Sequence, residues 1–233
     1  MSSDDRGVPV GDSGSSPWRR RPALRRRLDN GLARMSAVVY RASPMERSIS
    51  TMIGESLELH GKLAEAVPSI AMAAGIMIEA LKGGGKVMVA GNGGSAADAQ
   101  HMAAELVNRF RLERAPIACV ALTTDTSVMT SIANDRSFEE VFARQVLALG
   151  KRGDVLVVIT TSGSSINVLK AIEAASSMGV STVALTGKDG IHGGRVDCEI
   201  RIPSTVTPRI QEAHLLVEHI LCDLVEQALS ARI

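Results

Sequence analysis

Aromatic residues are scarce in this 233-residue chain: one Trp, one Tyr and three Phe together make up 2% of it. Apolar residues nevertheless account for 45%, so the core must be built from Ala, Val, Ile, Leu and Met. Aliphatic side chains of this kind suit helices packed closely on a parallel sheet. The length allows one α/β domain with a buried core, plus a tail.

Cysteines are few, and long apolar runs are lacking. Cys119, Cys198 and Cys222 form no CxxC pair, which predicts buried free thiols and a reducing compartment. No apolar run approaches the roughly 20 residues that span a bilayer. The Arg-rich N-terminus also lacks the long apolar segment of a secretory signal. We therefore expect a cytoplasmic protein with no membrane span.

Positive charge is concentrated at the N-terminus, although the net charge of the chain is only +1. That balance carries no signature of nucleic-acid binding. Residues 1–34 hold eight Arg and four Asp among many Gly, Ser and Pro residues, so we predict a disordered basic extension over 1–44 and a folded domain over 45–233. The extension could contact an anionic surface or be dispensable, and we favour the second interpretation.

Strand and helix patterns alternate beyond residue 45. Two helices separated near Pro68 are expected up to about Leu81. Apolar strands are predicted at 86–91, 117–122, 154–160, 181–187 and 196–203, with helices at 95–110, between 123 and 149, at 166–178 and at 207–229. This alternation predicts an α/β three-layer sandwich with a central five-stranded parallel sheet flanked by helices.

Two strand-to-helix turns share a design suited to anions: VMVA-GNGGSA and VVIT-TSGSSIN. Ligands bind beyond the carboxyl ends of parallel strands, and helix N-termini there favour phosphate. The second turn, with its run of hydroxyl side chains, is the better phosphate candidate, although a helix cap in a tight turn explains it equally well. Neither turn fits GxxxxGK[ST] or GxGxxG, so no nucleotide cofactor is expected.

Two helices carry polar stripes next to these turns. On helix 95–110 the stripe consists of Asp98, His101, Glu105 and Arg109, and the opposite, buried face is predicted to hold Ala99, Ala103, Leu106, Val107 and Phe110. On helix 207–229 the polar side holds Gln211, Glu212, Leu215, Glu218 and His219, with His214 on its flank. The buried side is predicted to hold Ile210, Ala213, Leu216, Val217, Ile220, Leu221 and Leu224. Periodicity alone is consistent with solvated faces; an acid–base or metal site requires the two stripes to meet.

Five motifs in a fixed order carry a family resemblance: GNGGSAADAQH-xxx-E, Asn134-Asp135, ITTSGSS, LTGKDG and RIQEAHLLVEH. From about Met45 to the C-terminus the chain resembles the phosphoheptose isomerases of the SIS family. The resemblance implies the SIS fold and a homotetramer with active sites shared between subunits. It also implies isomerisation of D-sedoheptulose 7-phosphate to D-glycero-D-manno-heptose 7-phosphate through an enediol, feeding heptose biosynthesis.

The same resemblance implies residue roles. The base falls on Glu105 and the partner acid or base on His219. One Zn²⁺ per subunit falls on His101, Glu105, Gln211 and His219. Substrate contacts fall on Asn92, Gly93, Gly94, Ser95, Glu105, Asn134, Asp135, Thr160, Thr161, Ser162, Ser165 and Gln211. A carboxylate and an imidazole suit proton transfer between adjacent carbons at neutral pH, and zinc could polarise the carbonyl.

Two non-catalytic alternatives share the fold. The chain is also similar to the DnaA initiator-associating protein, a tetrameric SIS binding module, including IANDR and LCDLV. That relative lacks counterparts of Glu105 and His219, which favours the isomerase. A sugar-phosphate-sensing SIS regulator would need a DNA-binding domain, and the 34-residue basic stretch is too short and irregular for a helix-turn-helix.

Overall fold

A computed structural model describes residues 43–230, so the expected basic extension lies almost wholly outside the described residues. Helix α2 (Pro44–Lys62) begins with a capping box. The Ser43 hydroxyl accepts the backbone N–H of Glu46 at 3.2 Å, and the Glu46 carboxylate accepts that of Ser43 at 2.6 Å. The chain divides into two compact units between Thr51 and Met52, and the second carries the sheet.

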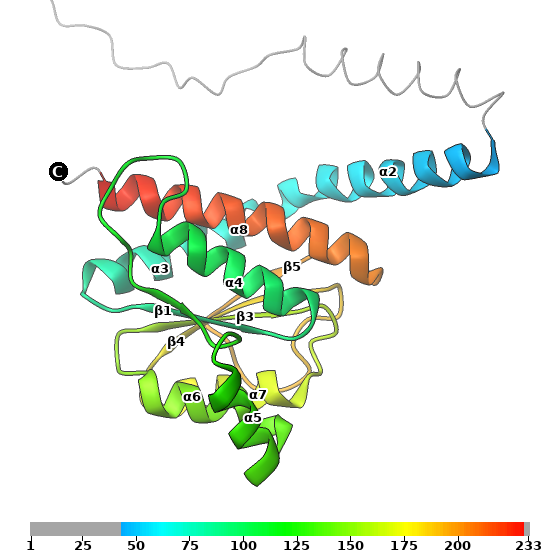
Figure 1. Cartoon of the computed structure of the whole chain (residues 1–233). Coiled ribbons are helices and arrows are strands. Elements are labelled where there is room, and N and C mark those ends of the chain that lie inside the picture. Colours follow the sequence, from blue (N-terminus) through cyan, green and yellow to red (C-terminus); the bar gives the residue numbers. More distant parts are fainter. Residues whose placement is uncertain (1–42, 231–233) are drawn as a thin grey trace, which may run out of the picture. The chain divides into compact units, whose positions relative to one another are not determined.

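The predicted alternation of strands and helices is confirmed (Figure 1). The strands are β1 (Val87–Gly91), β2 (Cys119–Ala121), β3 (Val155–Thr160), β4 (Ser181–Thr186) and β5 (Cys198–Arg201). The helices that follow α2 are α3 (Val67–Lys82), α4 (Gly94–Val107), α5 (Thr126–Asp135), α6 (Val141–Leu149), α7 (Ile166–Met178) and α8 (Thr207–Ser230), with 3-10 turns at Leu63–Ala66 and Phe138–Glu140. The break between α2 and α3 precedes Pro68, which occupies the first turn of α3, where a backbone N–H is not needed.

All five strands are parallel, in the order β2-β1-β3-β4-β5, which confirms the predicted sheet. Gly91 pairs with Ile159, and Thr160 with Thr186, so the carboxyl ends of β1, β3 and β4 lie at one edge. The strand order reverses at β1, because β2 lies on one side of it and β3 on the other. In open parallel sheets a ligand crevice opens at such a switch point.

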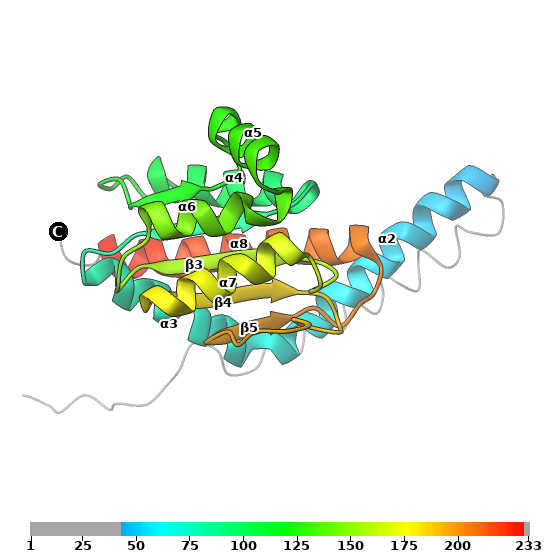
Figure 2. The same cartoon turned by 90° about the horizontal axis from the view of Figure 1, so that it is seen from below.

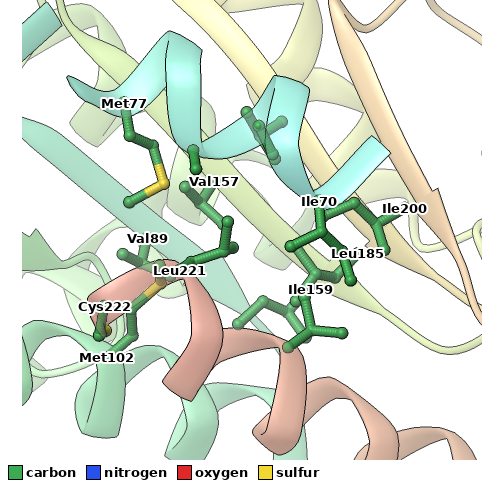
Figure 3. Close-up of a cluster of buried hydrophobic side chains, with 14 of the residues drawn as sticks. Ile70, Met77, Val89, Met102, Val157, Ile159, Leu185, Ile200, Leu221 and Cys222 are labelled. Carbon is green, nitrogen blue, oxygen red and sulfur yellow. The ribbon is translucent and has the colours of Figure 1, made fainter. Parts of the chain in front are cut away.

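Helices cover both faces of the sheet (Figures 1 and 2): α3, α4 and α8 on one, and α5, α6 and α7 on the other. Alternate residues of each strand serve the two cores. Val87 and Val89 face the first, and Met88 and Ala90 the second. Figure 3 shows the first core, where Met77 of α3, Met102 of α4 and Leu221 of α8 gather with strand residues such as Val89, Val157 and Ile159. Aliphatic and Met side chains fill it, as the composition indicates.

The three cysteines are free. Cys198 and Cys222 are buried and Cys119 is partly buried, in agreement with the predicted buried thiols. Burial raises the pKa of the Cys119 thiol to about 12, so this side chain stays protonated at neutral pH.

The expectation that no apolar run approaches the length of a membrane span is wrong if only length and composition are considered. Residues 44–82 contain an 18-residue window of mean hydropathy 1.5, which is long and apolar enough to cross a membrane by length and composition alone. Within this range α3 buries Ile70, Ala73, Ala74 and Met77 in the first core. Only 28% of that window is buried, and a single helix of this kind is weak evidence for a membrane span.

A buried ion pair fixes the segment after α4 to the end of α8. The fully buried Glu226 carboxylate accepts the backbone N–H groups of Phe110, Arg111 and Leu112 at 2.8–2.9 Å. It also accepts Nε of Arg114 at 3.1 Å. Burial alone would raise the pKa of Glu226, but these donors outweigh it and hold the pKa below its ordinary value.

We expect Glu226→Gln to destabilise the protein by about 3 kcal/mol or more, because it leaves the Arg114 guanidinium buried without a counter-charge. Urea unfolding at neutral pH measures this loss. Glu58→Gln is the matched control: it breaks an exposed pair with Lys62, and the free energy of unfolding should not change within error. An equally stable Glu226→Gln protein would show that the carboxylate does not hold this segment.

Candidate active site

The two predicted ligand turns meet at the switch point. Residues 91–95 follow β1 and lead into α4, whereas residues 160–165 follow β3 and lead into α7. The side chains of Asn92 and Asn167 join them by two hydrogen bonds of 2.9 Å. The crevice between β1 and β3 is therefore bordered by two helix N-termini, whose free N–H groups favour an anion.

The first turn lies directly against α8. A side chain added at Gly94 would place its Cβ 2.3 Å from Nε2 of Gln211, so the Gln211 amide packs directly on this turn and would have to move to admit a larger residue. Ser95 is buried in the first turn of α4, while Gly93 and Gly94 are exposed. The substrate-contact residues predicted here thus lie beside Gln211, which is itself predicted to contact substrate and metal.

The second turn presents several hydroxyl groups, of which the Ser162 hydroxyl accepts the backbone N–H and the hydroxyl of Ser164. Thr160 is buried, and its hydroxyl accepts the backbone N–H of Gly163 at 3.2 Å. Ser165 occupies the position before α7 but makes no side-chain capping bond, so a helix cap does not account for its hydroxyl. Thr161, Ser162 and Ser165 are at least partly exposed at the same edge of the sheet.

A second close packing rigidifies this turn. Gly163 has a φ of +67°, and a Cβ there would lie 1.8 Å from the backbone oxygen of Gly190. Gly190 belongs to the LTGKDG motif. Its loop is held by Glu199, which accepts the backbone N–H of Ile191 at 2.7 Å and the Thr186 hydroxyl at 3.0 Å. The LTGKDG motif therefore packs against the hydroxyl-rich turn and restricts its conformation.

The polar stripes of α4 and α8 meet. Nε2 of His101 lies 2.8 Å from Nε2 of His219, and the two rings make an edge contact with centroids 5.1 Å apart. One ring must donate and the other accept, since a neutral imidazole carries a single N–H. Oε1 of Glu105 lies 3.7 Å from Nε2 of His101. A carboxylate and two imidazoles, all partly exposed, therefore converge on one patch.

Two sets of predicted residues are not brought to this patch. Gln211 lies against Gly94, eight residues from His219 on α8, which is about 12 Å along a helix axis. Asn134 and Asp135 lie at the end of α5, on the other face of the sheet, exposed and bonded to each other at 2.8 Å. Within one chain the predicted site is therefore divided.

Some of the predicted helix faces are wrong. Leu216 and Leu224 of α8 and Val107 of α4, all predicted to be buried, are 37%, 38% and 45% exposed. Glu218 and His214, assigned to the polar side and its flank, are fully buried. The period gives the two sides of a helix, but the angle at which α8 crosses the sheet and α4 decides which residues are covered.

Glu218 is a fully buried acid that precedes His219 on α8. Neither of its carboxylate oxygens has a hydrogen-bond partner, and Oδ2 of Asp98 on α4 also has none. Burial raises the pKa of Glu218 to about 8, and the Asp98 carboxyl raises it in the same direction. Burial raises the pKa of Asp98 as well, while His101 opposes that rise. At neutral pH Glu218 is therefore mostly protonated.

His214 is the second buried group that periodicity alone misplaces. Its Nε2 lies 3.2 Å from the Thr186 backbone oxygen, and its Nδ1 has no partner. Burial lowers the pKa of His214 to about 4, although the Thr186 carbonyl opposes this. His214 is therefore neutral and distinct from the His101–His219 pair.

The donor set of the patch fits zinc in its chemistry. Zinc prefers imidazole nitrogen and carboxylate oxygen, and two imidazole nitrogens point at each other with Glu105 one helical turn away. Within residues 43–230, however, no group of three or more His, Cys, Asp or Glu side chains is already arranged to hold a metal ion. Gln211 also remains apart from the histidine pair.

This fold and site define an α/β module with a crevice suited to an anionic ligand, and comparison with known proteins makes the class specific. The family described as "SIS domain" matches residues 55–187. The phosphoheptose isomerase of Shewanella oneidensis is 53% identical over 190 residues, which are 79% of this chain and 96% of that protein.

Solved structures agree. The phosphoheptose isomerase of Francisella tularensis is 40% identical with a TM-score of 0.76, and the match covers 79% of this chain and all of that one. The Neisseria gonorrhoeae phosphoheptose isomerase is 41% identical with a TM-score of 0.74, over 78% and 99% of the two chains. The chain belongs to the phosphoheptose isomerase family of SIS-domain proteins.

We expect Glu218→Gln to stabilise the protein as the pH rises. The pKa of Glu218 in the folded state is raised above its ordinary value of 4.5. The wild-type protein therefore has its full stability below pH 4.5, where the carboxyl is protonated in both the folded and the unfolded state. It loses stability as the pH rises toward about 8, because only the unfolded state then ionises freely. Urea unfolding of metal-free protein should show equal stability of variant and wild type at about pH 4, and a gain on the order of 5 kcal/mol for the variant at about pH 9.

Glu113→Gln is the control for this prediction, because the Glu113 side chain is 93% exposed. Its free energy of unfolding should follow that of the wild type at every pH. A Glu218→Gln gain that did not grow with pH would contradict a buried, protonated carboxyl.

Proposed function

We propose that this protein interconverts D-sedoheptulose 7-phosphate and D-glycero-D-manno-heptose 7-phosphate through an enediol. Glu105 acts as the base and His219 as its acid–base partner. The observation that carries the proposal is the convergence of Glu105, His101 and His219 from two helices onto one patch. The product would feed heptose biosynthesis. Membership of the phosphoheptose isomerase family supports the assignment.

Substrate phosphate would bind at the turn after β3. Thr160, Thr161, Ser162 and Ser165 supply hydroxyl groups, and the N-terminus of α7 supplies free backbone N–H groups and the positive end of a helix dipole. Asn92, Gly93, Gly94 and Ser95 face the same crevice from the first turn. Binding the phosphate and the sugar at separate turns orients the reacting carbons, which is a large part of the catalytic task.

Isomerisation moves one proton between adjacent carbons. In the direction from ketose to aldose, a carboxylate removes a proton from C1 while the C2 carbonyl oxygen gains one, which gives the enediol. The proton then returns to C2 as the hydroxyl at C1 loses its own. Glu105 and His219 are suited to these two exchanges, since a carboxylate and an imidazole can each accept a proton and return it.

We also propose a zinc ion, which His101, Glu105 and His219 would hold. The family resemblance implies Gln211 as a further ligand, and its amide would have to leave its place beside Gly94 to reach the ion. When bound, zinc would polarise the carbonyl group and stabilise negative charge on its oxygen. The Nε2 atoms of His101 and His219 lie 2.8 Å apart and share one hydrogen bond. A metal ion held by both nitrogen atoms would take the place of that bond.

We expect Glu105→Gln to lower kcat by at least about 100-fold while substrate affinity stays within a few-fold, because the amide keeps the shape but cannot accept the proton. Aldose formation from sedoheptulose 7-phosphate measures the rate, and calorimetry measures binding. Parallel assays with a chelator and with added zinc separate loss of the base from loss of a metal.

Glu113→Gln serves as the matched control, since its exposed side chain lies beyond the end of α4. It should keep full activity. A fully active Glu105→Gln protein would mean that another residue is the base.

A homotetramer with shared active sites belongs to the same proposal. Asn134 and Asp135 lie on the face of the sheet opposite Glu105 and His219, so a second subunit would bring the two sets together. Association would also cover large apolar side chains that are exposed on α4, on the segment that follows it and on α8: Val107, Leu112, Leu215, Leu216 and Leu224.

Complementation tests the sharing of sites. Glu105→Gln and Asp135→Ala homo-oligomers should both be nearly inactive. When equal amounts are unfolded and refolded together, about one quarter of the sites in a randomly mixed oligomer would hold both intact residues, and activity should return to that fraction. Mixed refolding that restores no activity, with both variants assembled, would place all catalytic groups in one subunit.

The DnaA-binding alternative is not favoured. Glu105 and His219 both lie beside His101 on adjoining helices rather than at unrelated surface positions, and a scaffold has no need for that convergence. We propose a cytoplasmic location, which the three free thiols support.

A further inference from the structure

Asn167 is a buried amide at the start of α7. Its side chain is 4% exposed, and the neighbouring positions Val168, Ala171 and Ile172 belong to the second hydrophobic core. A polar side chain at such a position is unfavourable unless its hydrogen-bonding groups are satisfied. An aliphatic residue would fill the same place without needing a hydrogen-bond partner. The hydrogen-bond partner of the Asn167 amide therefore indicates the role of this residue.

The partner is Asn92 alone. Nδ2 of Asn167 donates to Oδ1 of Asn92 at 2.9 Å, and Nδ2 of Asn92 donates to Oδ1 of Asn167 at 2.9 Å. Within the described residues the Asn167 side chain makes no other hydrogen bond. The two residues are 75 positions apart in the sequence. The pair crosses the point where the strand order reverses, between the turn after β1 and the helix after β3.

A reciprocal pair of this kind fixes both amide planes. Each amide spends one N–H and one lone pair on the other, and each retains a second N–H and a second lone pair. Asn92 is partly exposed, whereas Asn167 is not. The remaining hydrogen-bonding capacity that a ligand can reach is therefore that of Asn92, held in one orientation by Asn167.

We propose that Asn167 is a positioning residue for the isomerase reaction. It orients the Asn92 amide toward the sugar phosphate and locks the turn after β1 to the turn after β3, so that both close on one substrate. This inference rests on the proposed function in one respect, the binding of a sugar phosphate in the crevice between the two turns.

The first experiment compares two buried amides. Asn167→Ala should lower kcat/KM for sedoheptulose 7-phosphate by about tenfold or more, since Asn92 loses its fixed orientation. Gln145→Ala is the matched control. Gln145 is 6% exposed and donates only to the backbone oxygens of Leu122 and Val141, so its truncation should reduce stability and leave kcat/KM unchanged. Asn167→Ala with wild-type kcat/KM would overturn the proposal.

The second experiment uses Asn167→Asp, which keeps the size of the side chain. An ionised carboxylate only accepts hydrogen bonds and would oppose the Asn92 carbonyl, whereas the protonated acid again offers one donor and one acceptor. The kcat/KM of this variant, divided by the wild-type value at each pH, should therefore rise as the pH falls toward the pKa of the new carboxyl. A ratio that is constant with pH would show that the pair does not position Asn92.

A third measurement does not depend on turnover. In the wild type the side-chain NH₂ signals of Asn92 and Asn167 should show slowed hydrogen exchange, and Asn167→Ala should abolish the protection at Asn92 but leave that of Gln145. Unprotected Asn92 in the wild type would overturn the pairing itself. If the wild type shows this protection but neither binds nor converts sedoheptulose 7-phosphate, the proposed function fails while the amide pair stands.

Discussion

The reversal of strand order at β1 is the constraint on which the rest of the structure depends. Parallel strands joined by helices cross over with one hand. With β2 on one side of β1 and β3 on the other, α4 and α7 consequently leave the sheet over opposite faces. Two helix N-termini and two small-residue turns then border one crevice. The position of the ligand site is therefore a consequence of chain topology.

A second constraint sets the geometry of the histidine pair. His101 and His219 come from helices that pack over the same core, where Met102, Leu106 and Leu221 are fully buried. The separation of the two rings is thus decided by aliphatic packing, and Glu226 secures the distal end of the same two elements. His101 and His219 thus meet at the surface because the apolar faces of α4 and α8 pack against the same core.

The sequence predicts the sheet and the ligand turns well, because both depend on local patterns. Continuous apolar runs such as VLVVIT can only be covered on both faces, and glycine-rich turns directly after such strands are typical of ligand-binding crevices. The helix faces are predicted less well. Glu218 looks solvated on a helical wheel, yet α4 covers it, and nothing in the local sequence encodes the crossing of two helices. Asn167 is invisible for the same reason, since its partner is 75 residues away. Asn134 and Asp135 follow from family resemblance alone, because a single chain leaves them far from Glu105.

Buried side-chain atoms without a hydrogen-bond partner distinguish helices α4 and α8 from the other described elements. Within residues 43–230 every buried side-chain atom that lacks a hydrogen-bond partner belongs to α4 or α8: Asp98, His214, Glu218 and Ser230. Elsewhere, buried polar side chains have partners: Asp154 accepts the backbone N–H groups of Lys86 and Lys151, and Gln145 donates to the backbone oxygens of Leu122 and Val141. Unpaired buried groups reduce stability, and they persist where a site needs titratable groups in an apolar setting. Two of these groups, Asp98 and Glu218, lie where α4 meets α8, the same contact that presents Glu105, His101 and His219. His214 faces β4 instead, where its ring lies at the Thr186 carbonyl. Unfavourable burial and the convergence of Glu105, His101 and His219 therefore coincide at the contact between α4 and α8.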